Sequence, residues 1–134
     1  MQNVAFLLKN VDNFVLTYFN FRFVSRPHWK QIGISLKQLT DDCLFWIEKK
    51  TYSEEEIAVR FKHKIVKIHC FPNGNGRHSR LMADVIVNHI FGKPVFTWSR
   101  ANLNKRGEQR TNYLKAIKEA DKDNIKLLMK FAKT

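Results

Sequence analysis

The sequence predicts an all-α fold, and three observations carry that prediction. Glycine and proline, the residues that interrupt helices, number only five and three among 134 residues. The alternation of apolar and polar residues that is typical of half-buried strands is scarce. Apolar residues recur instead at helical spacing between recognisable start and stop signals. The length fits one domain with a core of its own.

The beginning of the chain is its least regular part. Residues 1–28 are rich in phenylalanine and predict an irregular N-terminal segment, so the domain is expected to span residues 29–134. Near its start, Gly33 lies between Ile32 and Ile34, a pattern that favours a short strand or hairpin over a helix.

Helix signals become clear from Ser35 onward. Ser35 is a candidate N-cap for a helix that begins with Leu36. Ser53 and Glu56 form a capping box for a second helix, which is expected to end near His69. The remaining predicted helices run from Arg77 to a stop at Gly92 and Pro94, from about Leu103 to Ala120, and onward from a cap at Asp121 or Asp123.

Charge, cysteine content and hydrophobicity indicate which partners and which cellular compartment to expect. The 24 lysines and arginines exceed the 12 acidic residues and leave a net charge of +12, which favours anionic partners such as nucleotides, nucleic acid or acidic proteins. Solvation of helix surfaces by lysine explains the same excess equally well. Cys43 and Cys70 give no sign of a bridge, and no stretch of eighteen apolar residues occurs. A cytoplasmic protein without a membrane span is therefore expected.

The segment best suited to chemistry is residues 69–80, His-Cys-Phe-Pro-Asn-Gly-Asn-Gly-Arg-His-Ser-Arg, here called the motif segment. A Gly-Asn-Gly turn that opens a helix presents backbone N–H groups at the positive end of the helix dipole, where an anion can bind. Arg77 and Arg80 add fixed charges that suit phosphate. His69 adds a titratable imidazole. The sequence therefore predicts a phosphate site with a base beside it.

The motif segment resembles the signature of Fic domains, His-x-Phe-x-(Asp or Glu)-Gly-Asn-Gly-Arg-x-x-Arg. The wider stretch from about Trp46 to Phe131 is similar to the bacterial Fic branch called mobile mystery protein B, on the segments Glu56-Ile-Ala-Val-Arg-Phe and Phe96-Thr-Trp. The resemblance implies a Fic-type helical bundle with the motif loop between two core helices. It leaves open a short β-hairpin flap, for which Lys30–Ile34 is the candidate.

The same resemblance implies an activity, the transfer of AMP from the co-substrate ATP to a Ser, Thr or Tyr hydroxyl of a target protein. His69 would be the catalytic base that takes the hydroxyl proton. Asn75 would contact the α-phosphate, and Arg77 and Arg80 would hold the β- and γ-phosphates. The full set implied for nucleotide binding is Asn73, Gly74, Asn75, Gly76, Arg77 and Arg80, with Phe71 as a structural motif residue.

Asn73 is the departure from the signature, which has a carboxylate at this position. That carboxylate holds Mg²⁺ in the family, so Asn73 is a weak candidate metal ligand and Mg²⁺ or Mn²⁺ is expected to be weakly held. A Fic-fold protein with impaired catalysis, retained for nucleotide binding or regulation, is therefore the alternative function. Doc-type phosphate transfer is disfavoured, because Doc motifs carry lysine where Gly76 stands.

Two further possibilities concern a metal ligand and a nucleic-acid partner. A zinc site at His63, His69, Cys70 and His78 is disfavoured, because these spacings match no common zinc site. A basic nucleic-acid-binding protein is the alternative from a different class, prompted by Trp98, Arg100, Lys105, Arg106 and Arg110, but these residues are dispersed and nucleic acid is disfavoured.

Regulation is expected to come from another chain. The inhibitory pattern (Ser or Thr)-x-x-x-Glu-(Gly or Asn) of many Fic proteins is absent from the sequence. A separate antitoxin-like protein that restrains Arg80 is therefore the hypothesis. Homo-oligomerisation stays open.

Overall fold

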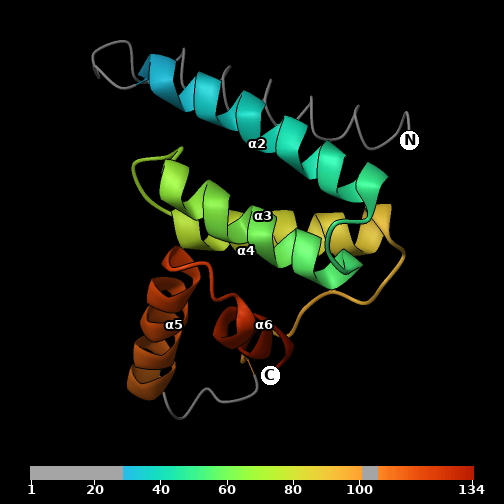
Figure 1. The fold of residues 1–134 in the computed structure, drawn as a ribbon. Coiled ribbons are helices and arrows are strands. Elements are labelled where there is room, and N and C mark those ends of the chain that lie inside the picture. Colours follow the sequence, from blue (N-terminus) through green and yellow to red (C-terminus); the bar gives the residue numbers. More distant parts are fainter. Residues whose placement is uncertain (1–28, 101–105) are drawn as a thin grey trace.

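The structure of the chain is a computed structural model that describes residues 29–100 and 106–134 (Figure 1). These residues form helices, turns and loops, and no strand occurs among them. The all-α prediction is therefore confirmed. The elements in order are α2 (Trp29–Lys49), α3 (Glu54–Ile68), α4 (Asn75–Val85), the π-helix η1 (Ile86–Ile90), α5 (Arg106–Asp121) and α6 (Lys126–Lys133). The predicted irregular segment, residues 1–28, lies outside the described residues.

Helix α3 is the centre of the fold. It packs against α2, α4, η1 and α6, and α5 packs against α6. In Figure 1, α2 lies along one side of the α3–α4 pair, and α5 and α6 lie on the other side. The core contains buried apolar side chains from every layer, among them Leu36, Cys43, Ile57, Phe61, Ile65, Met82, Ile86, Ala116 and Leu128. Because α3 is packed on several sides, the C-terminal end of this helix, where the motif segment begins, is held in place by the core.

Local signals explain the bounds of α3. Ser53 is the N-cap, and its hydroxyl accepts a hydrogen bond from the backbone N–H of Glu56 (3.3 Å). Three glutamates occupy the first turn, where the positive end of the helix dipole favours them. His69 ends the helix in the left-handed conformation (φ 58°, ψ 59°) that commonly closes a helix. The predicted cap and the predicted end of this helix are both confirmed.

The start of the domain differs from the prediction. Helix α2 begins at Trp29, so Ser35 lies inside the helix and not at its cap, and Lys30–Ile34 is helical, not a hairpin flap. The strand prediction at Gly33 was wrong because packing outweighed local propensity. Helical spacing places Leu36, Leu39 and Cys43 together in the core, and this burial exceeds the cost of about 1 kcal/mol for one glycine in a helix.

The end of the domain also differs at one cap. Asp121 is the last residue of α5, Asp123 lies in a turn with a positive φ of 65°, and Ile125 is the residue that precedes α6. Neither aspartate caps α6, because both carboxylates bind basic side chains of α3. His63 and Lys67 contact Asp121, and Arg60 contacts Asp123.

Candidate functional site

The motif segment connects α3 to α4, and its first residue has an unusual backbone. His69 is exposed and adopts a positive φ, a conformation that glycine adopts more easily than any other residue. The next residue, Cys70, is fully buried and anchors the chain in the core. The exposed His69 side chain therefore lies between the end of α3 and a buried anchor.

Asn75 closes the loop that follows. Its Oδ1 accepts a hydrogen bond from the backbone N–H of Phe71 (2.9 Å), and its Nδ2 donates one to the carbonyl oxygen of Phe71 (2.6 Å). The Asn75 side chain is only 7% exposed. These two bonds hold the chain between His69 and α4 in one shape. One N–H of the Asn75 amide is still available for the predicted contact with a phosphate.

Phe71 fixes the loop on the core side. Its ring is half-buried and packs on the hydrophobic core and, edge to face, on the imidazole of His78 (4.8 Å between ring centroids). Burial lowers the pKa of His78, so this imidazole is neutral near pH 7. His78 therefore contributes packing rather than charge at this position.

The start of α4 presents backbone donors. Gly74 precedes the helix with a φ of 74° and offers no side-chain cap. The His78 N–H donates to the Gly74 carbonyl oxygen (2.9 Å), so the N–H groups of residues 75–77 come before the first intrahelical bond. Such groups at a helix start attract an anion.

Gly76 is a glycine that the fold itself does not require. Its φ is not positive, and a Cβ at this position would meet no atom within 4 Å. A glycine in a helix is less favourable than alanine by about 1 kcal/mol. Close approach of a ligand to the backbone is a physical reason for a glycine here. Gly74 differs, because its positive φ alone disfavours any side chain.

The two motif arginines lie three residues apart on α4. Arg77 is exposed and its guanidinium extends toward Gly74, where an added Cβ would lie 3.5 Å from Nη2. Arg80 is half-buried. Neither arginine forms an ion pair with a residue that the structure describes. Two cations that have no carboxylate partner in the described part of the chain, beside the N–H groups of residues 75–77, form a strongly anion-attracting surface.

Asn73 is exposed in the loop and brings no charge to a metal. Among the described residues, no group of three His, Cys, Asp or Glu side chains could hold a metal ion. Mg²⁺ is normally held by one or two carboxylates together with substrate phosphates. The side chains of the motif segment therefore do not fit a resident Mg²⁺.

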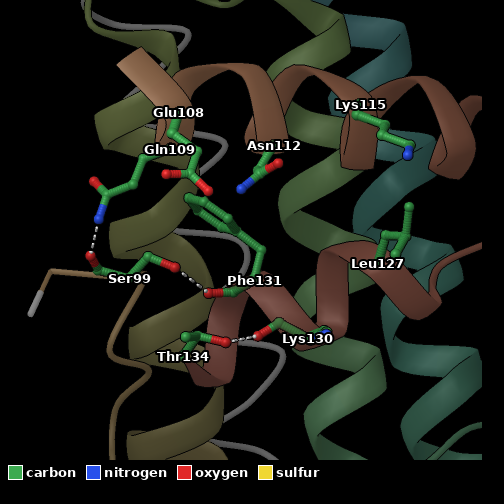
Figure 2. A pocket seen from close by; sticks show the side chains of 9 residues that line it. All are labelled: Ser99, Glu108, Gln109, Asn112, Lys115, Leu127, Lys130, Phe131 and Thr134. Atoms are coloured by element: carbon green, nitrogen blue, oxygen red, sulfur yellow. Dashed lines mark hydrogen bonds between the residues drawn. The ribbon is translucent and has the colours of Figure 1, made fainter. Parts of the chain in front are cut away.

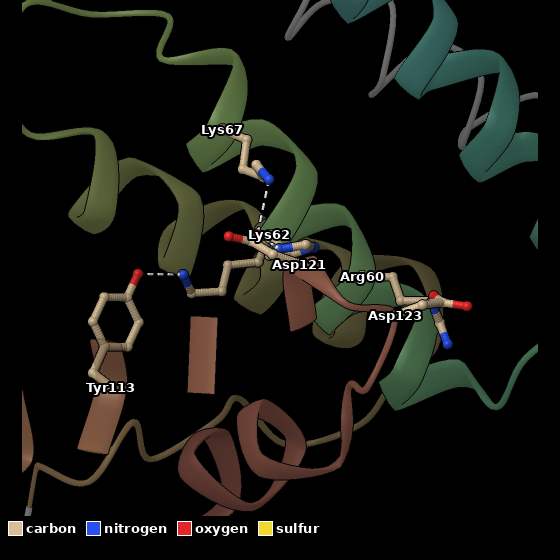
Figure 3. Close-up of polar contacts among 7 residues, drawn as sticks. Arg60, Lys62, Lys67, Tyr113, Asp121 and Asp123 are labelled. Atoms are coloured by element: carbon tan, nitrogen blue, oxygen red, sulfur yellow. Dashed lines mark hydrogen bonds and ion pairs between the residues drawn. The ribbon is translucent and has the colours of Figure 1, made fainter. Parts of the chain in front are cut away.

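The sequence did not point to Lys62 of α3, a lysine close enough to Arg80 for the two charges to interact. Lys62 is fully buried, and its Nζ donates a hydrogen bond to the hydroxyl of Tyr113 of α5 (2.7 Å; Figure 3). Desolvation, with the charge of Arg80 in second place, lowers the pKa of Lys62 to about 7. No local pattern in the sequence distinguishes Lys62 from the solvated lysines of the same helix.

A second polar cluster ties α3 to the end of α5 and is also drawn in Figure 3. Lys67 Nζ and His63 Nε2 lie 2.8 and 2.7 Å from Asp121 Oδ1, and Arg60 binds Asp123. Burial lowers the pKa of His63 more than Asp121 raises it, so a neutral imidazole donates Nε2–H and Lys67 supplies the charge. His63 therefore has a structural partner in Asp121.

A cavity of about 340 Å³ lies between α5 and α6 (Figure 2). Its lining residues are Ser99, Glu108, Gln109, Asn112, Lys115, Leu127, Lys130, Phe131 and Thr134. No motif residue lines it, so its volume does not identify the candidate site. Phe131, on its wall, packs against Tyr113 (5.3 Å between ring centroids), the tyrosine that binds Lys62.

The residues that prompted the nucleic-acid alternative do not form one exposed surface. Trp98 is 4% exposed, and its Nε1 donates a hydrogen bond to Asp84 (2.9 Å). Its ring is part of the core and does not offer a stacking face to a base. Arg100, Arg106 and Arg110 are exposed, while Lys105 lies outside the described residues.

Comparison with protein families found one match that includes the motif segment. A model of the Fic/DOC family matches residues 23–87, which include α2, α3, the whole motif segment and α4. Residues 23–87 are a Fic/DOC-family segment. Searches of curated proteins and of solved structures gave no significant match. The helix–loop–helix of this Fic segment, from α3 through the motif segment to α4, is therefore the candidate site. Among the described residues, no helix is long and apolar enough to cross a bilayer.

Proposed function

We propose that the chain is a protein adenylyltransferase, which transfers AMP from ATP to a Ser, Thr or Tyr hydroxyl of a target protein. One observation carries the proposal. The exposed imidazole of His69 ends α3, and the same short loop leads to backbone N–H groups and two arginines that lack carboxylate partners among the described residues. A base and an anion site at the two ends of one short loop suit transfer of a phosphoryl-type group.

In the proposed reaction, the target hydroxyl oxygen attacks the α-phosphorus of ATP. The bond between that oxygen and phosphorus forms, and the bond from the α-phosphorus to the bridging oxygen of the β-phosphate breaks, so pyrophosphate leaves. His69 accepts the hydroxyl proton. Arg77 and Arg80 balance the charge that accumulates on the leaving pyrophosphate. The N–H groups of residues 75–77 hold phosphate oxygens in place.

A metal ion would enter this site with the nucleotide. The neutral Asn73 offers Mg²⁺ no charged ligand, so the phosphates of ATP would hold the ion themselves. The steps above use only groups of the chain and the substrate.

Asn73 also supports a second candidate, a Fic-fold protein with impaired transfer that binds nucleotide for a regulatory purpose. Loss of an anionic ligand weakens the hold on a divalent cation. The two candidates differ in the rate of AMP transfer and not in fold, so the substitution Asn73→Asp distinguishes them. A separate inhibitory protein that supplies a carboxylate to Arg80 is compatible with both candidates.

The test is to incubate the purified protein with host lysate, Mg²⁺ or Mn²⁺, and ATP labelled on the α-phosphate. We expect labelled protein bands that disappear in His69→Ala and that do not form from γ-labelled ATP. If Asn73→Asp labels targets and the wild type does not, the impaired candidate is correct. A folded wild type and a folded Asn73→Asp that both leave the lysate unlabelled would contradict adenylyl transfer.

A further inference from the structure

Lys62 is a buried lysine without a carboxylate partner among the described residues. It is 0% exposed, and among those residues its Nζ has one hydrogen-bond partner, the neutral hydroxyl of Tyr113. The Nζ atom also lies 4.7 Å from the centroid of the Tyr113 ring and 5.9 Å from that of Trp98. A charged lysine in such surroundings is costly unless an anion comes close.

The charged and polar groups that bear on the charge of Lys62 come from α3, α4 and α5. On α4, Arg80 repels the ammonium, and the carboxylate of Asp84 is engaged by Trp98 Nε1 and by the backbone N–H of Phe96. On α5, Tyr113 feels the positive charge of Arg80 as well. The neighbouring His63 on α3 binds Asp121 instead. Lys62, which is buried, and Arg80 and Tyr113, which are half-buried, thus form one cluster, here called the floor cluster, without a negative charge of its own.

We propose that the floor cluster is the base of the nucleotide phosphate site, and that Lys62 takes up a proton when the phosphates of ATP reach Arg80. The inference rests on the proposed function, because it uses the same anion at the motif arginines. Before ATP binds, a largely neutral Lys62 spares Arg80 the repulsion of a buried cation. When the phosphates bind, their negative charge offsets that of Arg80 and stabilises the ammonium form. Lys62 is thereby a positioning residue that acts through Arg80 and Tyr113.

The physical consequence is a proton that enters with the ligand. At pH 8 a lysine whose pKa is about 7 is mostly neutral. A bound polyphosphate that raises this pKa by about two would lead to uptake of about 0.8 proton per ATP. The terminal phosphate of ATP is already ionised at pH 8, so the group that binds the proton would belong to the protein.

Calorimetric titration with ATP at pH 8, in HEPES and in Tris, tests the proposal, because the two buffers differ in ionisation enthalpy. Metal is left out by adding EDTA. We expect a binding enthalpy that depends on the buffer in the wild type. Lys62→Arg, which stays protonated throughout, and Lys62→Met, which cannot bind a proton, are expected to bind ATP with a buffer-independent enthalpy.

The outcomes separate the two proposals. A wild type that binds ATP with the same enthalpy in both buffers overturns the role of Lys62 and leaves nucleotide binding intact. Uptake that persists in Lys62→Arg or in Lys62→Met assigns the proton to another group and also overturns it. A folded wild type that shows no binding of ATP at all contradicts the proposed function together with this inference.

Discussion

The side chain of Asn75 and the backbone of Phe71 form a closed pair, in which each gives one hydrogen bond and receives one. The pair spans the turn between His69 and the first turn of α4. It therefore sets the position of the His69 imidazole relative to the N–H groups at the start of α4. Asn75 was predicted as a phosphate ligand, and the structure gives it a structural task in addition.

Asn75→Ala is expected to destabilise the loop and to impair transfer. It removes both hydrogen bonds that the Asn75 amide, itself only 7% exposed, forms with the backbone of Phe71, which costs about 1–3 kcal/mol in free energy of unfolding. Urea denaturation measures the loss. The matched control is Asn73→Ala, which removes an exposed amide from the same loop and is expected to change stability by less than about 0.5 kcal/mol. Equal stability of the two variants would contradict the role of Asn75.

The two motif glycines are expected to respond differently to alanine. Gly74→Ala places a side chain at a φ of 74° and is expected to cost about 1 kcal/mol or more of stability. Gly76→Ala meets open space and improves helix propensity, so stability is expected to be equal or higher. ATP affinity of Gly76→Ala is nevertheless expected to fall, because the methyl group would occupy the approach of a phosphate. An unchanged affinity would place the anion elsewhere.

His69→Gly is expected to raise stability and to abolish transfer activity. Glycine adopts the left-handed conformation of residue 69 without strain, so the free energy of unfolding is expected to rise by about 0.5–1 kcal/mol. Transfer of the α-label is expected to be lost, since the base is gone. Thermal denaturation and the labelling assay measure the two effects. His89→Gly, which removes another exposed histidine at a different site, is the control that should retain activity.

The sequence was sufficient for the fold class and for the motif segment, since both depend on local signals. Ser53 and Glu56 mark a helix start by direct hydrogen-bonding chemistry, and Gly92 marks a stop, with the positive φ (65°) that this position favours. The conformation of a residue can be predicted from the sequence where its contacts are with residues close by in the chain.

The predictions that were wrong concern residues whose conformation depends on contacts with distant parts of the chain. Gly33 is helical because α2 packs on α3, and Asp121 is not a cap because His63 and Lys67, more than fifty residues earlier, bind it. Lys62 was not predicted for the same reason. A lysine on a helix is usually solvated, and only the docking of α5 places Tyr113 against it. Side-chain pairs between helices carry no local signal.

Lys62 also predicts a dependence of stability on pH. Folding lowers its pKa from 10.5 to about 7, so between these values the unfolded chain binds more protons than the folded one. The contribution of Lys62 to the free energy of unfolding therefore falls as the pH drops from about 10.5 to about 7, on the order of 1.4 kcal/mol per pH unit, and is constant below. Lys62→Met removes this dependence.

We therefore expect Lys62→Met to be more stable than the wild type at pH 7, with an advantage that shrinks as the pH is raised toward 10. Chemical denaturation of both proteins at pH 7, 8, 9 and 10 measures the difference, in which the titration of all other groups cancels. Lys64→Met, an exposed lysine on the same helix, is the control and is expected to show a difference that does not vary with pH. A constant difference for Lys62→Met as well would mean that Lys62 keeps its ordinary pKa and that Tyr113 and the aromatic rings stabilise the ammonium form fully.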